Sequence, residues 1–232
     1  MENLQQATKM LKSANISKYI VLALCTVIIL LMLTWVWNKS RLDEANCKRM
    51  DDLYKEFPTL HSINPENVEF THNLRDYYIK TAYNACSAGQ YKNDFVNICA
   101  LKNCIKQGCR CLDFEVYSVD NKPVVATSSV DDYSIKETYN SVPFASVLET
   151  INDYAFSGGT CPNPNDPLII HLRIMSNNRG IYKEMANNFE SSLSSRILGP
   201  KYSFENNGEN IGALPIKNFL GKVIVSVDKA NP

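Results

Sequence analysis

The chain has 232 residues, of which 45% are hydrophobic and 21% are charged. Its 24 Lys and Arg residues balance 24 Asp and Glu residues, which argues against both a disordered chain and a nucleic-acid-binding protein. With 9 Gly and 10 Pro residues, a collagen-like or low-complexity chain is also excluded. Asn is frequent, at about one residue in nine, as in proteins encoded by the AT-rich genomes of some viruses.

The N-terminal part contains an apolar segment long enough to cross a membrane. Residues 19–37 carry no charge, and a helix of this length, rising about 1.5 Å per residue, covers the roughly 30 Å hydrocarbon core of a bilayer. Tyr19 and Trp37 mark its ends, where aromatic rings favour the interface. A cleaved signal peptide would have a shorter apolar region and a small-residue cleavage site. We predict a tail at 1–18 and a single transmembrane helix at Tyr19–Trp37 that contacts the lipid bilayer.

The charges beside this segment do not fix its orientation. Three Lys residues precede it and four Lys or Arg residues follow it closely, so the positive-inside rule favours neither direction. The sequence therefore predicts a single-pass membrane protein and leaves open the side on which the C-terminal part lies.

The 8 Cys residues could form disulfides, remain thiols or bind a metal. Cys25 lies in the apolar segment, and the rest are an odd number that cannot all pair within one chain. Cys104, Cys109 and Cys111 are close in sequence but lack the second ligand pair of a structural zinc site. Disulfides are expected if the domain faces an oxidising compartment, and buried thiols are the equal alternative.

The remaining chain alternates between helical and strand patterns. Residues 38–71 are expected to form a connector with one short helix at Ala45–Phe57, followed by a domain at 72–232. Strands are predicted at Tyr77–Lys80, Cys109–Tyr117, Pro123–Ala126, Pro167–Ile174 and Lys222–Val227. Helices are predicted at Lys92–Gln107, Ser141–Phe156 and Gly180–Leu198. This alternation predicts an α/β fold with a parallel sheet or barrel.

Polar residues gather at the ends of the predicted strands, where parallel α/β folds place their chemistry. One face of each strand end contributes to a candidate site of Asn84, Asp113, Glu115, His171, Arg173 and Asp228. The two carboxylates could hold a divalent cation, or they could form salt bridges with Arg173. His171 is expected to be buried and structural, whereas His61 and His72 are expected to be solvated.

Five stretches resemble, in order and spacing, the X half of the catalytic barrel of phosphoinositide-specific phospholipases C. They are Gly108–Glu115 (similar to the family's GCRCVELD), Val124–Val125, Ile151–Phe156 (similar to IKDYAF), Pro167–Leu172 (similar to PVILSLE) and Leu214–Val225. The resemblance runs from Tyr77 to Asp228. It implies a partial or complete TIM-type (β/α) barrel of the phospholipase C-like phosphodiesterase kind, preceded by the transmembrane helix.

The resemblance also implies which positions would carry the chemistry. The family uses two histidines as general acid and base, an Asn and three acidic residues as calcium ligands, and lysines that meet the substrate phosphate. At these positions the chain carries Tyr83 and Ser129 for the histidines, Asn84, Asp113, Glu115 and Arg173 for the calcium ligands, and Ser226 and Asp228 for the lysines.

These changes remove groups that the reaction needs. Tyr titrates near pH 10 and Ser does not titrate usefully, so neither replaces a histidine at neutral pH. An Arg at a ligand position puts a cation where calcium would bind. We therefore expect no metal and no other cofactor, with Arg173 within salt-bridge distance of Asp113 or Glu115. Calcium would be the cofactor if the chain were a divergent enzyme.

The sequence thus favours a membrane-anchored pseudoenzyme with a structural or interaction role among other proteins of a membrane-associated assembly. The Asn-rich composition favours a virion membrane or capsid-associated protein of a large DNA virus. Two alternatives stay open. One is a divergent phosphodiester hydrolase with rearranged catalytic groups, and the other is a non-catalytic binder of lipid headgroups.

Overall fold

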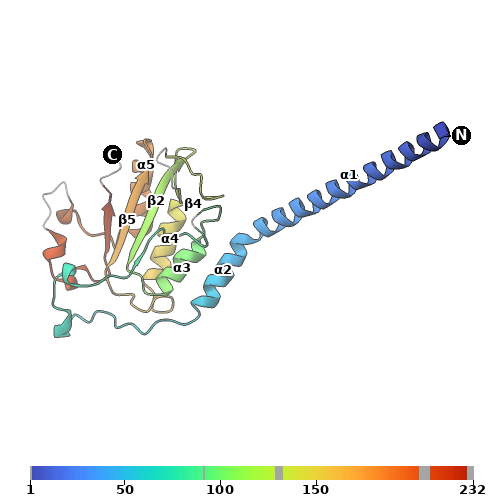
Figure 1. Cartoon of the computed structure of the whole chain (residues 1–232). Helices are drawn as coiled ribbons and strands as arrows, with labels where there is room; N and C mark the ends of the chain where they lie inside the picture. Colours follow the sequence, from blue (N-terminus) through green and yellow to red (C-terminus); the bar gives the residue numbers. More distant parts are fainter. Residues whose placement is uncertain (1, 91, 129–132, 204–209, 229–232) are drawn as a thin grey trace. The chain divides into compact units, whose positions relative to one another are not determined.

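The computed structural model describes residues 2–90, 92–128, 133–203 and 210–228 (Figure 1). The chain divides into two compact units, Met1–Leu42 and Asp43–Pro232. The first unit contains the helix α1 (Glu2–Ser40), in which Ile16–Ser40 is long and apolar enough to cross a membrane. The predicted helix at Tyr19–Trp37 is confirmed, but helical structure begins much earlier, at Glu2.

The second unit is a mixed α/β domain. Its helices are α2 (Leu42–Leu53), α3 (Ile98–Lys106), α4 (Phe144–Ala155) and α5 (Gly180–Leu193). Its strands are β1 (Thr81–Ala82), β2 (Cys111–Val119), β3 (Lys122–Ala126), β4 (Val142–Pro143), β5 (Leu168–Met175) and β6 (Val223–Val227). Short 3-10 helices lie at Val68–Phe70, Leu74–Asp76, Pro200–Tyr202, Ile211–Ala213 and Ile216–Phe219.

The strands form a sheet in the order β4-β3-β2-β5-β6, and β1 also pairs with β2. The pairs β1–β2, β2–β5 and β5–β6 are parallel. Helices α3, α4 and α5 cover one face of the sheet (Figure 1). Strand alternation sends Leu112 and Phe114 of β2, with Ile170 and Leu172 of β5, into this core, where each is at most 1% exposed. The other face carries the polar side chains.

The prediction of a parallel sheet is wrong for β3, which pairs antiparallel with β2, as β4 does with β3. The cause is the two-residue turn Asp120–Asn121, whose φ angles are 50° and 61°. Positive φ at both central residues is typical of a type I′ hairpin turn, and Asn and Asp tolerate it better than most residues. The turn returns the chain beside β2 without a crossover helix.

The predicted strand Tyr77–Lys80 is also wrong, because strand pairing is limited to Thr81–Ala82. Tyr and Ile favour strands, but the chain reaches β2 only at Lys80, whose carbonyl accepts hydrogen bonds from the N–H groups of Arg110 and Cys111.

The barrel is partial, and within the described ranges the sheet stays open. Val225 and Val227 of β6 are in register with buried Ile170 and Leu172, yet they are 37% and 48% exposed. Their exposure marks the edge of the sheet beyond β5.

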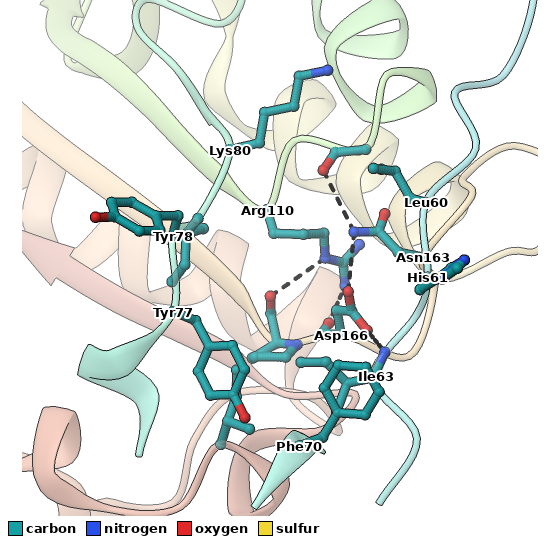
Figure 2. A pocket seen from close by; sticks show the side chains of 14 residues that line it. Leu60, His61, Ile63, Phe70, Tyr77, Tyr78, Lys80, Arg110, Asn163 and Asp166 are labelled. Atoms are coloured by element: carbon teal, nitrogen blue, oxygen red, sulfur yellow. Dashed lines mark hydrogen bonds between the residues drawn. The ribbon is translucent and has the colours of Figure 1, made fainter. Parts of the chain in front are cut away.

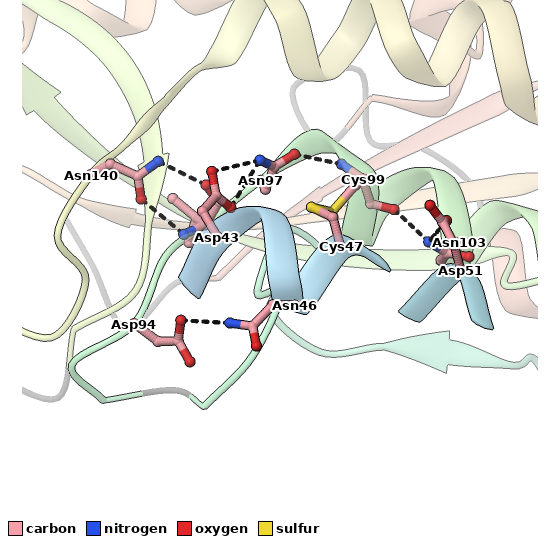
Figure 3. Close-up of a disulfide and its surroundings, with 10 residues drawn as sticks. Asp43, Asn46, Cys47, Asp51, Asp94, Asn97, Cys99, Asn103 and Asn140 are labelled. Atoms are coloured by element: carbon pink, nitrogen blue, oxygen red, sulfur yellow. Dashed lines mark hydrogen bonds between the residues drawn. A yellow bond between two sulfur atoms is a disulfide. The ribbon is translucent and has the colours of Figure 1, made fainter. Parts of the chain in front are cut away.

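Helix α2 is joined to the α/β domain by one face, so the connector is not a loose linker. A disulfide links Cys47 of α2 to Cys99 of α3 (Figure 3). Side-chain amides donate to carboxylates on both sides of this bond, over 2.8–3.0 Å: Asn97 to Asp43, Asn46 to Asp94 and Asn103 to Asp51. Asn46 is 5% exposed, and Asp94 is 3% exposed. The compact domain therefore begins with α2, well before residue 72.

Candidate functional site

The candidate site lies on the sheet face opposite the helices. Parallel pairing places Asp113 of β2 beside His171 of β5, and Glu115 beside Arg173. Asn84 follows β1 in a turn with φ 47°, and its N–H donates to Asp113 Oδ1 over 3.2 Å. Since residues two apart on a strand share a face, these side chains converge at one place.

Arg173 occupies the centre of this cluster. Its Nε and Nη2 donate to the two oxygens of Asp113 over 3.1 and 2.7 Å. Nη1 donates to Glu115 Oε1 over 2.5 Å, and Nη2 also donates to Asn84 Oδ1 over 2.6 Å. The predicted ion pair is confirmed, and Arg173 bonds both acids rather than one.

The remaining acceptor positions of the two carboxylates also have donors. Glu115 Oε2 accepts from the Tyr117 hydroxyl over 2.7 Å and from the Ser128 N–H over 2.9 Å. Asp113 Oδ2 lies 2.7 Å from His171 Nδ1. A calcium ion needs six to eight oxygen ligands with free lone pairs. Residues whose oxygens already accept from a guanidinium do not fit this ion.

Charge pairing outweighs burial in the titration of the cluster. Burial alone would raise the pKa of the Asp113 carboxyl, but hydrogen bonds from Arg173 and His171 lower it below its ordinary value. Burial would lower the pKa of Arg173, and its bonds to Asp113 and Glu115 raise it instead. Burial and the bond to Glu115 raise the pKa of Tyr117. Asp113 and Arg173 therefore stay ionised, and Tyr117 stays neutral, across the physiological pH range.

Two side chains that contact the cluster, those of Tyr83 and His171, are exposed to solvent. Tyr83 is 70% exposed, and the Arg173 guanidinium lies 4.4 Å from the centre of its ring, in a cation–π contact. The His171 side chain is 34% exposed. The expectation that His171 is buried is wrong, because the open sheet leaves this part of β5 uncovered.

The other predicted positions lie apart from the Arg173 bonds. Ser226 is exposed on β6, in register with His171, and the Asp228 N–H donates to the Leu172 carbonyl over 2.9 Å. Ser129 lies outside the described residues. Sequence reasoning missed Tyr117 and Ser128. Tyr117 could have been found, because it is two residues beyond Glu115 and shares its face.

A separate cavity of about 220 Å³ lies at the opposite, N-terminal ends of β2 and β5 (Figure 2). Its polar groups hold the connector in place. Asp166 accepts from the Ser62 hydroxyl and the Ile63 N–H, over 2.9 and 2.8 Å. Buried Arg110 donates to the carbonyls of Ala155, Asp166 and Pro167. These bonds give the cavity walls a structural role.

Comparison with known proteins identifies the family of the α/β domain. Residues 70–229 match the family model described as "Phosphatidylinositol-specific phospholipase C, X domain", so the chain belongs to this family. It is 28% identical over 123 residues to 1-phosphatidylinositol 4,5-bisphosphate phosphodiesterase 1 of Saccharomyces cerevisiae. That match covers 53% of this chain and 12% of the yeast protein.

A solved structure shows the same fold at low sequence identity. The crystal structure of L. pealei PLC21 aligns with a TM-score of 0.52 and 16% identity, over 67% of this chain and 19% of that one. A calcium-dependent phosphoinositol-specific phospholipase C from a Pseudomonas species aligns with a TM-score of 0.45 and 10% identity, over 75% of this chain and 63% of that one. The chain thus spans less than a fifth of the yeast protein and of PLC21.

Proposed function

We propose that the chain is a membrane-anchored, non-catalytic member of this family, in which Arg173 has replaced the metal and the site serves structure or protein interaction. The observation that carries the proposal is the set of bonds from one guanidinium to Asn84, Asp113 and Glu115. An Arg is always charged and matches carboxylates in bidentate fashion, so it can permanently neutralise acids that would otherwise repel each other.

The groups facing solvent also favour a non-catalytic role. Tyr83 stands where the resemblance implies a histidine, and its ring covers the guanidinium instead of presenting a group that titrates near pH 7. The charges of Asp113, Glu115 and Arg173 sum to about −1, which does not attract a phosphodiester.

One observation favours a second candidate, a phosphodiester hydrolase with a rearranged base. The His171 side chain is about one-third exposed, and its Nδ1 lies 2.7 Å from Asp113 Oδ2. A carboxylate that orients one ring nitrogen of a histidine leaves the other able to accept a proton. In this candidate, His171 is the general base and needs no metal ion. Mutation of His171 or Asp113 therefore distinguishes the two candidate functions.

The binder of lipid headgroups has less support. Such a binder needs exposed Lys or Arg side chains around the site, and the sequence offers Lys80 and Arg173 for this role. Lys80 Nζ donates to the Gln107 carbonyl over 2.7 Å, and Arg173 is bonded to carboxylates. Lys80 lies beside Arg110 and Cys111 at the N-terminal end of β2, away from the site, and the charge of Arg173 is neutralised by its carboxylate partners.

The disulfide supports an orientation that the flanking charges left open. Disulfides persist in oxidising compartments and are rare where thiols are kept reduced. With Cys47 bonded to Cys99, we infer that α1 anchors the chain and that the α/β domain lies on the oxidising side of the membrane. A place in a viral membrane, which the composition suggested, stays a prediction.

The test uses the full chain in detergent micelles and vesicles containing phosphatidylinositol or its phosphates. We expect no release of inositol phosphates with or without calcium, from the wild type or from His171→Ala. Calcium-dependent release that Asp113→Asn abolishes would overturn the proposal. Calcium-independent release that His171→Ala abolishes would establish the second candidate.

A binding measurement complements the assay. Arg173→Glu puts an acidic residue at the position on β5 where the resemblance implies a calcium ligand, so calcium should raise the unfolding temperature of this variant while leaving that of the wild type unchanged. Arg49→Glu, on the exposed face of α2, is the matched charge-reversal control and should not respond to calcium. A calcium response of the wild type equal to that of Arg173→Glu would contradict the replacement of the metal by Arg173.

A further inference from the structure

The end of α3 brings two cysteines together through backbone geometry. The Gly108 N–H donates to the Ile105 carbonyl over 2.8 Å, and the Cys109 N–H donates to the Cys104 carbonyl over 3.1 Å. Gly108 has φ 75°. This pattern is a Schellman motif, in which the residue after the left-handed glycine packs its side chain against the residue five positions earlier. Cys109 therefore packs against Cys104.

The two thiols interact directly. The interaction with the Cys104 thiol lowers the pKa of Cys109, against the effect of burial. The same interaction and burial raise the pKa of Cys104. Lys80 lies near enough to favour the Cys109 thiolate further. Thiolates are the nucleophiles of disulfide exchange, so Cys109 is the group of this pair that reacts first.

The same helix already carries a disulfide at its other end, between Cys99 and Cys47. A compartment that oxidises this pair, whose residues are 52 positions apart, also oxidises two thiols held in contact by a five-residue turn. The neighbouring Cys86 is 1% exposed, and burial raises its pKa to about 12, which keeps it a thiol. No metal explains these cysteines, since no group of three potential ligands occurs among the described residues.

We propose that Cys104 and Cys109 are a second disulfide-forming pair, a redox modification site that fixes the C-terminal end of α3 to the start of β2. The proposal concerns a site distant from Arg173 and does not depend on whether the chain is an enzyme. With the first disulfide, it would fix α3 at both ends.

The co-reactant is an external disulfide, of the small-molecule or oxidoreductase class. The Cys109 thiolate attacks one of its sulfurs, which breaks the external S–S bond and releases one thiolate. The Cys104 thiol then passes its proton to that thiolate, and the resulting Cys104 thiolate attacks the Cys109 sulfur of the mixed disulfide. This releases the second external group as a thiolate, which takes up from water the proton that Cys109 had lost on ionisation. The two protein thiols lose two electrons, and the external disulfide is reduced to two thiols. Because Cys109 is 5% exposed, the exchange precedes final packing of the α3 end.

Tryptic mapping of the non-reduced full chain tests the proposal, because Lys106 lies between the two cysteines. Protein purified in detergent without reductant is alkylated under denaturing conditions and digested. We expect peptide 103–106 to be linked to peptide 107–110. Peptide 42–48 linked to peptide 93–102 reports the Cys47–Cys99 bond in the same sample and shows that oxidised protein was recovered.

Two variants sharpen the result. Cys109→Ser should convert Cys104 from linked to fully alkylated, whereas Cys86→Ser should leave the 103–106 link intact. The proposal is wrong if Cys104 and Cys109 are both alkylated in wild-type protein, whether peptide 42–48 is linked to peptide 93–102 or all four of these peptides are alkylated. It is also wrong if Cys104 is linked to Cys86, which lies in peptide 81–92. The wild-type map decides the question even if a variant fails to fold.

Discussion

Replacing Arg173 by Ala should destabilise the α/β domain more than the loss of an ordinary surface ion pair. The Arg173 side chain is 17% exposed, and those of Asp113 and Glu115 are 6% and 4% exposed. Removing the guanidinium leaves two nearly buried carboxylates close together without a cation. Breaking a buried pair in this way costs about 3–5 kcal/mol. For a domain of this size, that is a fall in unfolding temperature of roughly 6–20 °C.

The dependence of this loss on pH has a definite sign. In the wild type, Asp113 has a pKa below its ordinary value of 3.8, so its contribution to stability is complete above that value and is lost as the pH falls through the folded-state pKa. In Arg173→Ala, burial and Glu115 would raise the pKa of Asp113. The folded variant would then bind a proton more tightly than the unfolded chain, and its stability should increase as the pH falls from 8 to 5.

Thermal unfolding of the full chain in detergent, followed by intrinsic fluorescence between pH 5 and 8, measures both effects. The double variant Asp113→Asn with Arg173→Ala removes one of the repelling charges and should be more stable than Arg173→Ala alone. A cost below about 1 kcal/mol for Arg173→Ala, unchanged over this pH range, would show that the pair is solvated and that the reasoning is wrong.

Three further changes test other parts of the fold by thermal unfolding. Gly89→Ala would place a Cβ 2.2 Å from Asp94 Oδ2 and 2.3 Å from Asn46 Nδ2, so it should cost about 1–3 kcal/mol by separating this buried pair. Gly158→Ala, with nothing within 4 Å, is its control and should change the free energy of unfolding by less than about 0.5 kcal/mol. Cys47→Ala should cost about 2–4 kcal/mol by removing the disulfide that closes a long loop, and the same difference between variant and wild type under reducing conditions, where both lack the bond, would contradict this. Tyr117→Phe should cost about 1.5–3 kcal/mol, because Glu115 loses a donor, and no change would show that water replaces the hydroxyl.

The core elements and the central ion pair could be predicted because they depend on local periodicity. Helices α4 and α5 and strands β2 and β5 carry strong patterns, and the structure places each within a few residues of its predicted bounds. Once two strands are parallel, alternation alone puts acids from one and a basic residue from the other on a shared face. The pairing of Arg173 with Asp113 and Glu115 follows from that shared face.

Features that depend on distant contacts or on single turns could not be predicted in this way. The direction of β3 is set by Asp120 and Asn121, two residues that carry no periodic signal. The partner of Cys47 is chosen by the packing of α2 on α3, and an odd number of cysteines allows many pairings. The exposure of His171 depends on which segments cover the sheet face, and the order of strands decides that.

The bond between Cys47 and Cys99 also imposes an order on the making of the protein. At roughly 5–20 residues per second, a ribosome adds Cys99 about 3–10 s after Cys47. For most of this interval α2 has neither its sulfur partner nor the polar partners at residues 94, 97 and 103, and the first downstream thiol to emerge is Cys86. A bond formed then between Cys47 and Cys86 would have to be exchanged before the sheet could form, and such reshuffling takes seconds to hours. Where such a bond forms, the yield of folded protein would depend on the rate of disulfide exchange during synthesis as well as on the stability of the finished domain.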